Sequence, residues 1–257
     1  MGSQPTFRIR IALLITTASI LTSMLAGCST VNQGGGTPAA PTTSVQTLEY
    51  YPYQVKGYQN SYPKKTIQIL IPADARNATA DGAPLNGNPA IGVVDDQSGS
   101  VTERLYSSAL GPILQQAIGR SADEAGLSAS SSSDVTYKPV IKNTTEYVLE
   151  SKIRRCWVKK ARNANGQYGP VWRTVADVAI DVSIYKPPFS VPFWTGSTTD
   201  TYYDPPVGSF GLGSEDEAGI YDEPGQVLSV ALTRSVAAIF QRQDLRNLML
   251  EDDIKSH

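Results

Sequence analysis

The fold is decided by residues 146–185, which read EYVLESKIRRCWVKKARNANGQYGPVWRTVADVAIDVSIY. In the second half, apolar and polar residues alternate, which is typical of an antiparallel strand with one buried face. Asn165-Gly166 lies between the two halves and is a strong cue for a hairpin turn. We therefore predict two long paired strands, 146–160 and 171–185. The residues expected on the buried face of the second strand are Trp172, Ala176, Val178, Ile180, Val182 and Ile184, with Arg173, Asp177, Asp181 and Ser183 opposite.

Two further strands are expected, one before this hairpin in the sequence and one after it. Residues 64–71, KKTIQILI, alternate with Ile67, Ile69 and Ile71 on one side. Residues 190–203 can add a fourth strand after Lys186-Pro187-Pro188, because proline cannot donate to a strand ladder and ends the preceding strand.

Two amphipathic helices are expected. Ser100-Val101-Thr102-Glu103 has the pattern of a capping box, and Gly126 is a natural stop for the helix that follows. Pro112 lies inside this helix and should kink it. The second helix is expected over 225–242, and the leucines after it suggest a short continuation or a terminal strand.

These elements predict an α+β fold: an antiparallel sheet of about four strands with two amphipathic helices on one face, preceded by a signal peptide and a flexible linker. The folded part is expected to be a single domain, 46–257. Its long loops are expected at 72–99 and 187–225, where glycine, proline and acidic residues gather.

Leu25-Ala26-Gly27-Cys28 resembles the bacterial lipobox. Arg8 and Arg10 precede an uncharged stretch, as in a signal peptide. The resemblance implies that residues 1–27 are removed and that Cys28 carries a covalent lipid, including an acyl chain such as palmitate. Residues 28–45 then form a linker rich in Gly, Pro, Thr and Ser. Because Ser29 rather than an aspartate follows the cysteine, the expected location is the outer membrane, facing the periplasm.

The order of elements supports a second resemblance. An early strand, a helix, a long hairpin reading EYVLESKI and VADVAIDVSIY, and a final helix SVALTRSVAAIF follow the lipobox and linker. Over Thr66 to Gln241 this order is similar to the ABC-type transport auxiliary lipoprotein family. It implies a non-catalytic subunit of a lipid-trafficking or envelope-maintenance complex. The insertion 187–225 and the loop before the first helix are larger than that family's pattern.

Composition excludes several classes of function. Without Arg8 and Arg10 the chain has 20 basic against 24 acidic residues, so it lacks the basic balance of a nucleic-acid binder. The only histidine is His257, which removes histidine-based catalytic triads and zinc sites. No phosphate-binding loop motif occurs, so no nucleotide is expected. We expect no enzyme activity, no metal and no cofactor beyond the lipid on Cys28.

Cys156 is the only other cysteine, so no disulfide can form within the chain once Cys28 is lipidated. A single thiol can be a buried apolar group, an intermolecular bridge or a reactive nucleophile. Its position beside Trp157 in a strand favours burial.

Residues 152–162 hold six basic residues in eleven. On a regular strand Lys152 and Arg154 would lie on one face and Arg155 and Lys159 on the other, so no single patch is expected. The charges could protect an exposed strand from edge pairing, or contact a lipid headgroup, lipopolysaccharide or partner protein. The candidate binding residues here are Arg154, Arg155, Trp157 and Lys159.

A second group of candidates lies near residues 200–223. Phe193, Trp194, Tyr202 and Tyr203 could stack on a sugar beside several carboxylates, so the alternative function is a cell-wall glycan hydrolase or binder. Asp216, Glu217 and Asp222 could instead ligate calcium, although their spacing matches no EF-hand.

Overall fold

A long antiparallel hairpin lies at the centre of the fold. The computed structural model describes residues 42–45, 48, 60–77, 90–96, 98–107, 110–139, 145–163, 171–203 and 223–256. Strands β7 (Tyr147–Asn163) and β8 (Val171–Tyr185) pair from Val148 opposite Tyr185 to Asn163 opposite Val171. The predicted pairing of these two strands is therefore confirmed, while the predicted turn at Asn165-Gly166 lies outside the described residues.

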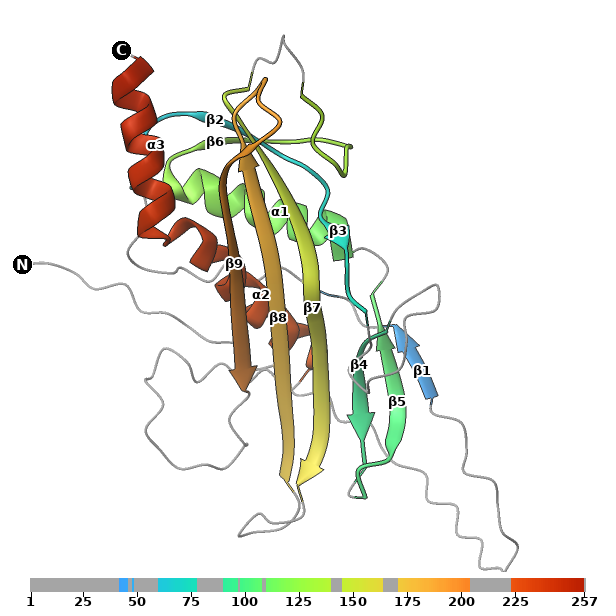
Figure 1. The fold of residues 1–257 in the computed structure, drawn as a ribbon. Helices are drawn as coiled ribbons and strands as arrows, with labels where there is room; N and C mark the ends of the chain where they lie inside the picture. Colours follow the sequence, from blue (N-terminus) through green and yellow to red (C-terminus); the bar gives the residue numbers. More distant parts are fainter. Residues whose placement is uncertain are drawn as a thin grey trace, which may run out of the picture. The chain divides into compact units, whose positions relative to one another are not determined.

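Within the described ranges, the sheet around this hairpin is mixed and has nine strands (Figure 1). The prediction of a four-stranded antiparallel sheet is wrong, because β7 is met on its second side by parallel strands. Strand β9 (Pro192–Tyr203) pairs antiparallel with β8, as expected for residues 190–203. The remaining strands are β1 (Thr42–Val45), β2 (Thr66–Ile69), β3 (Ala73–Asp74), β4 (Ala90–Asp95), β5 (Val101–Tyr106) and β6 (Ser128–Ser131).

Three short strands share the second side of β7. Strands β2, β3 and β4 pair with it in parallel, one after another along its length. Strand β6 extends the sheet beyond β2, while β5 and β1 extend it beyond β4. Two of these strands lie in the stretch 72–99 and β1 ends the predicted linker, where short segments without clear periodicity gave no strand signal.

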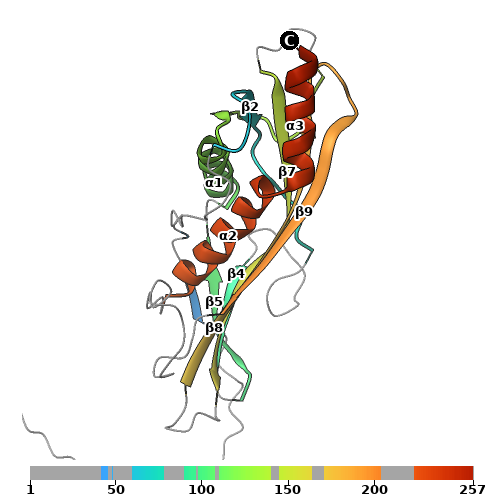
Figure 2. The same cartoon turned by 90° about the vertical axis from the view of Figure 1, so that its left-hand side faces the viewer.

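Helices α1 (Leu110–Ala125), α2 (Pro224–Phe240) and α3 (Gln243–Ser256) lie on one side of the sheet in the described part of the chain (Figure 2). Helix α2 is buried on almost all sides because it packs between α1 and the strands β7, β8 and β9. The core combines Ile153, Cys156 and Val158 of β7 with alternate residues of β8 and with α2. The alternation of β8 is thus confirmed from Ala176 to Ile184.

The start of α1 differs from the prediction. Val101–Tyr106 forms β5, and the helix begins only at Leu110, so Ser100 and Glu103 do not form a capping box. Pro112 falls in the first helical turn, where an amide hydrogen is not needed for an intrahelical bond, and no kink is required. The helix ends as expected at Gly126, whose φ of 103° favours glycine.

The C-terminal residues form a third helix, α3, rather than a strand. Its leucines do not make a regular stripe, so the sequence pattern was ambiguous. None of the helices in the described ranges is both long and apolar enough to cross a bilayer.

Candidate binding face

A β-bulge in β7 creates the main candidate site. Ile153 pairs with Ile180, but the next pair in register is Arg155 with Ala179, so Arg154 is an extra residue. A bulge of this kind changes which side of the strand the following residues face. As a result, both Arg154 and Arg155 are exposed, whereas Ile153 and Cys156 on either side of them are buried.

The bulge gathers four of the predicted basic residues, Lys152, Arg154, Arg155 and Lys159, on one face. The expectation that they divide between two faces is wrong, because it assumed an unbroken period of two. We call this helix-free side of β7, β8 and β9 the open face. Its β7 residues are Glu150, Lys152, Arg154, Arg155, Trp157 and Lys159, of which Glu150 and Trp157 are half-buried and the others exposed.

A buried arginine supports the bulge from the neighbouring strands. Arg76 Nη1 donates to the carbonyl oxygens of Cys156, at 3.1 Å, and Ala90, at 3.4 Å. Its Nε and Nη2 bind the two carboxylate oxygens of Asp74 at 2.9 and 2.7 Å. Burial would raise the pKa of Asp74, but the bonds from Arg76 outweigh it and hold that pKa below its usual value.

The position of Arg76 explains this role. Strand β3 ends opposite Ile153, and the pairing of β4 with β7 begins at Val158. The guanidinium group lies in the gap between these two pairings and supplies hydrogen bonds that a strand would otherwise give.

The exposed cations are balanced by aspartates. The pairs of Arg154 and Arg155 are partly exposed and contribute about 0–1 kcal/mol each to stability, whereas Asp95, the partner of Lys159, is buried. Because β7 has strands on both sides, the basic residues do not serve to protect a sheet edge. The pairs are Arg154 with Asp181 at 2.6 Å, Arg155 with Asp177 at 3.0 Å and Lys159 with Asp95 at 2.6 Å.

A groove of about 390 Å³ lies on the open face beside the bulge. Its volume falls in the range of small-molecule sites, about 300–1,000 Å³. Side chains from three neighbouring strands line it: Glu150, Lys152 and Arg154 of β7, Asp181, Val182 and Ser183 of β8, and Thr195, Gly196 and Ser197 of β9.

Both acids of the groove already accept hydrogen bonds. Glu150 Oε2 accepts from the backbone amide of Tyr137 at 2.8 Å, and Asp181 Oδ2 accepts from Arg154. Tyr137 stacks on Tyr185 with ring centroids 4.3 Å apart, which holds the segment after β6 against this face. Lys152 has no ion-pair partner in the ranges that the structure describes.

The four aromatic candidates of β9 do not form one platform. Trp194 is buried toward the helices, where Nε1 donates to Asp244 Oδ2 at 3.0 Å. Tyr202 is also buried, with the guanidinium of Arg234 5.7 Å from its ring. Phe193 packs against Tyr147 with centroids 5.4 Å apart. Tyr203 alone among the four is exposed.

The structure describes two carboxylates of the 200–223 stretch: Asp200, which lies 3.4 Å from Arg234 Nε, and Glu223, which is exposed at the start of α2. Burial raises the pKa of Asp200, and Arg234 opposes that rise. The calcium candidates Asp216, Glu217 and Asp222, and the lipidation residue Cys28, lie outside the described residues. Within those residues, no three His, Cys, Asp or Glu side chains are grouped to hold a metal ion.

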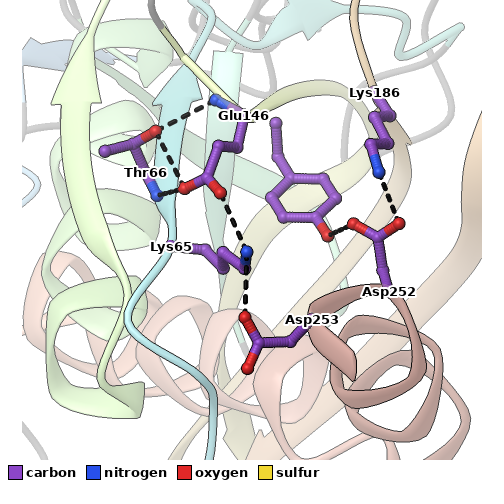
Figure 3. A network of polar contacts seen from close by, with 7 residues as sticks. Lys65, Thr66, Glu146, Lys186, Asp252 and Asp253 are labelled. Atoms are coloured by element: carbon purple, nitrogen blue, oxygen red, sulfur yellow. Dashed lines mark hydrogen bonds and ion pairs between the residues drawn. The ribbon is translucent and has the colours of Figure 1, made fainter. Parts of the chain in front are cut away.

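A second polar cluster attaches α3 to the sheet (Figure 3). Lys65 Nζ lies 2.9 Å from Asp253 and 3.0 Å from Glu146, and these carboxylates raise the pKa of Lys65. Asp252 accepts from Tyr147 at 2.5 Å and pairs with Lys186. Sequence reasoning missed this cluster because its members come from four distant segments. Its groups are bound to one another, so its role is structural.

Comparison of the sequence with protein families and with curated proteins gives no match. Solved structures that resemble this chain, at TM-scores below 0.5, include the following two. A Xanthomonas campestris protein of family DUF330 has 11% identity and a TM-score of 0.46, covering 82% of this chain and 99% of that one. A homolog of the neuraminyllactose-binding hemagglutinin from Helicobacter pylori has 9% identity and a TM-score of 0.43, covering 81% and 99%. At these values no function is transferred to this chain.

Proposed function

We propose that this chain is a lipid-anchored envelope protein that binds a ligand or partner through its open face and catalyses no reaction. The observation that carries the proposal is the bulge at Arg154. It places four candidate residues, Arg154, Arg155, Trp157 and Lys159, on one side of the sheet, away from the helices. The lipobox ending at Cys28 supports the anchor and the location at the periplasmic side of the outer membrane.

Two aspartates of the open face, Asp177 and Asp181, are not spaced as the carboxyl pair of a glycosidase. Asp177 and Asp181 are each paired with an arginine. They are four residues apart on one strand, which separates them by about 13 Å. A glycosidase needs two carboxyl groups about 5–9.5 Å apart. These two residues therefore do not form such a pair.

The finer form of the proposal is an auxiliary subunit of a lipid or envelope ABC transport system, held in an envelope protein complex. The order of lipobox, linker, strand, helix, hairpin and final helix supports it. The membrane contact is made by the lipid on Cys28, and neither nucleic acid nor nucleotide is required.

Crosslinking in the native envelope tests the proposal. A photo-crosslinking amino acid at Thr199, which is exposed on β9, reports on the open face, and one at Leu250 of α3 is the control. We expect envelope proteins to be captured from position 199 and not from position 250. Recovery of transporter subunits would support the auxiliary role. Capture of cell-wall glycan alone, or capture only from position 250, would contradict the proposal.

The anchor is tested separately. The chain should incorporate labelled palmitate and sediment with membranes, and Cys28→Ala should do neither. A Cys28→Ala form that still sediments with label would show that the lipidation site has been misassigned.

A further inference from the structure

We propose that the groove beside the bulge is a subsite for a phosphate group, bound by the ammonium of Lys152 and by hydroxyls of β9. This inference rests on the proposed function, because it names the chemistry of a ligand that the open face would bind. It concerns the groove bounded by Lys152, Asp181 and Ser197, which lie in one row across β7, β8 and β9.

The charged groups of the groove differ in whether they are free to bind a ligand. Glu150 and Asp181 already accept hydrogen bonds, and Asp181 is compensated by Arg154. Lys152 is exposed and has no ion-pair partner in the described ranges. Lys152 is therefore the cation of the groove that a ligand can reach without displacing an ion-pair partner, and the four formal charges of the groove balance.

The groove also contains hydrogen-bond donors from β7 and β9. Thr195 and Ser197 are exposed on the same face of β9 and line the groove with Lys152. Only Nε of Arg154 is bound to Asp181 in the ion pair, and a guanidinium has further N–H groups that can donate outward. The groove thus offers two cationic groups and two hydroxyls on strands either side of Asp181.

These donors favour one class of anion as the ligand. A phosphate ester presents several acceptor oxygens and can be reached from donors on two strands, whereas a carboxylate presents two. Lysine binds phosphate as a compact point charge, and arginine adds a planar set of donors. A phosphate ester is therefore the ligand chemistry that best fits this donor set. It can be supplied by a phospholipid headgroup or by a soluble phosphate ester.

The bulge is what makes this site possible. It keeps Arg154 on the open face beside Lys152 and also turns Arg155 to that side. On a regular strand, Arg155 would lie on the side of Ile153, in the core.

Calorimetric titration of the lipidated full chain in a non-ionic detergent tests the site. The probes are glycerol 3-phosphate and dihexanoyl phosphatidylglycerol, with glycerol as the phosphate-free control. We expect binding of at least one phosphate probe, none of glycerol, and weaker binding as salt is added. Binding of the short-chain lipid alone would identify a headgroup site, and binding of glycerol 3-phosphate a site for soluble esters.

The decisive variant is Lys152→Gln, which should weaken phosphate binding about tenfold. Lys255→Gln removes the same charge from an exposed position on α3 and should leave binding unchanged. Absence of binding to both phosphate probes, or equal binding by the Lys152→Gln protein, would overturn the subsite. If crosslinking from Thr199 persists in that case, the proposed function stands without the phosphate site.

Discussion

Arg76 Nη1 lies 3.1 Å from the carbonyl oxygen of Cys156, at the point along β7 between its pairings with β3 and β4. This contact joins the buried side of the sheet to the bulge that shapes the open face. The guanidinium group supplies a hydrogen bond where β7 has no strand partner, at the residue that follows Arg154 and Arg155 of the candidate site.

Replacement of this arginine should destabilise the fold. Arg76→Met leaves the carbonyl of Cys156 without its donor and Asp74 without its cation. We expect a loss of about 2–4 kcal/mol in the free energy of unfolding. Urea denaturation measures it. Arg154→Met is the matched control, because its exposed pair with Asp181 should change stability by less than about 1 kcal/mol. Equal losses in the two variants would show that Arg76 does not support the bulge.

Replacing each of two glycines by alanine should change the stability of the fold in opposite directions. A Cβ on Gly92 would lie 2.4 Å from the backbone oxygen of Val158, so β4 could not keep its distance from β7. Gly119 lies within α1 with nothing within 4 Å of a Cβ. Gly92→Ala should lower the unfolding temperature, and Gly119→Ala should stabilise by about 0.5–1 kcal/mol. Thermal unfolding measures both effects. A stabilised Gly92→Ala protein would contradict the close approach of Gly92 to Val158.

The thiol of Cys156 should be inert in the native protein. The side chain is buried in the core, and burial raises its pKa to about 12. In a Cys28→Ala chain at pH 8, we expect no alkylation by iodoacetamide until urea unfolds the protein, as mass spectrometry would show. Rapid labelling of the folded chain would show that Cys156 is a reactive thiol.

The parts of the fold with strong periodicity could be predicted from the sequence. The strands 147–163 and 171–185 and the helix 224–240 lie within a few residues of their expected bounds, because each buries one regular face or stripe. Periodicity does not indicate, however, which strands pair with one another. Strands β2, β3 and β4 are two to six residues long, and their parallel pairing with β7 follows from contacts far along the chain.

The arrangement of the candidate site on one face could not be predicted, for a related reason. The residues Arg154, Arg155, Trp157 and Lys159 could be named from charge and an aromatic neighbour, but their faces could not. A single extra residue reverses the side of each residue after it. Nothing local in Ile153-Arg154-Arg155 marks the bulge, since the support comes from Arg76, about 80 positions earlier.

The attachment of α3 should depend on acidity through Asp252. Burial alone would raise the pKa of this carboxyl, but bonds from Lys186 and Tyr147, with the nearby charge of Lys65, hold it below its usual value of 3.8. A folded-state pKa below the unfolded value means that the carboxylate stabilises the fold fully above pH 3.8, and this contribution is lost as pH falls through the folded-state pKa. The protection of the α3 amides against hydrogen exchange, taken relative to the intrinsic exchange rate at each pH, should therefore fall in acid.

Asp252→Asn tests this dependence directly. The variant should lose about 1–2 kcal/mol of unfolding free energy at pH 7, because Lys186 and Tyr147 lose a charged acceptor. Its stability should also fall less steeply than that of the natural chain between pH 5 and pH 2, as measured by urea unfolding at each pH. Glu251→Gln removes one negative charge from the exposed side of the same helix and should keep the natural slope. Parallel slopes for Asp252→Asn and the natural chain would show that another carboxylate controls the acid response.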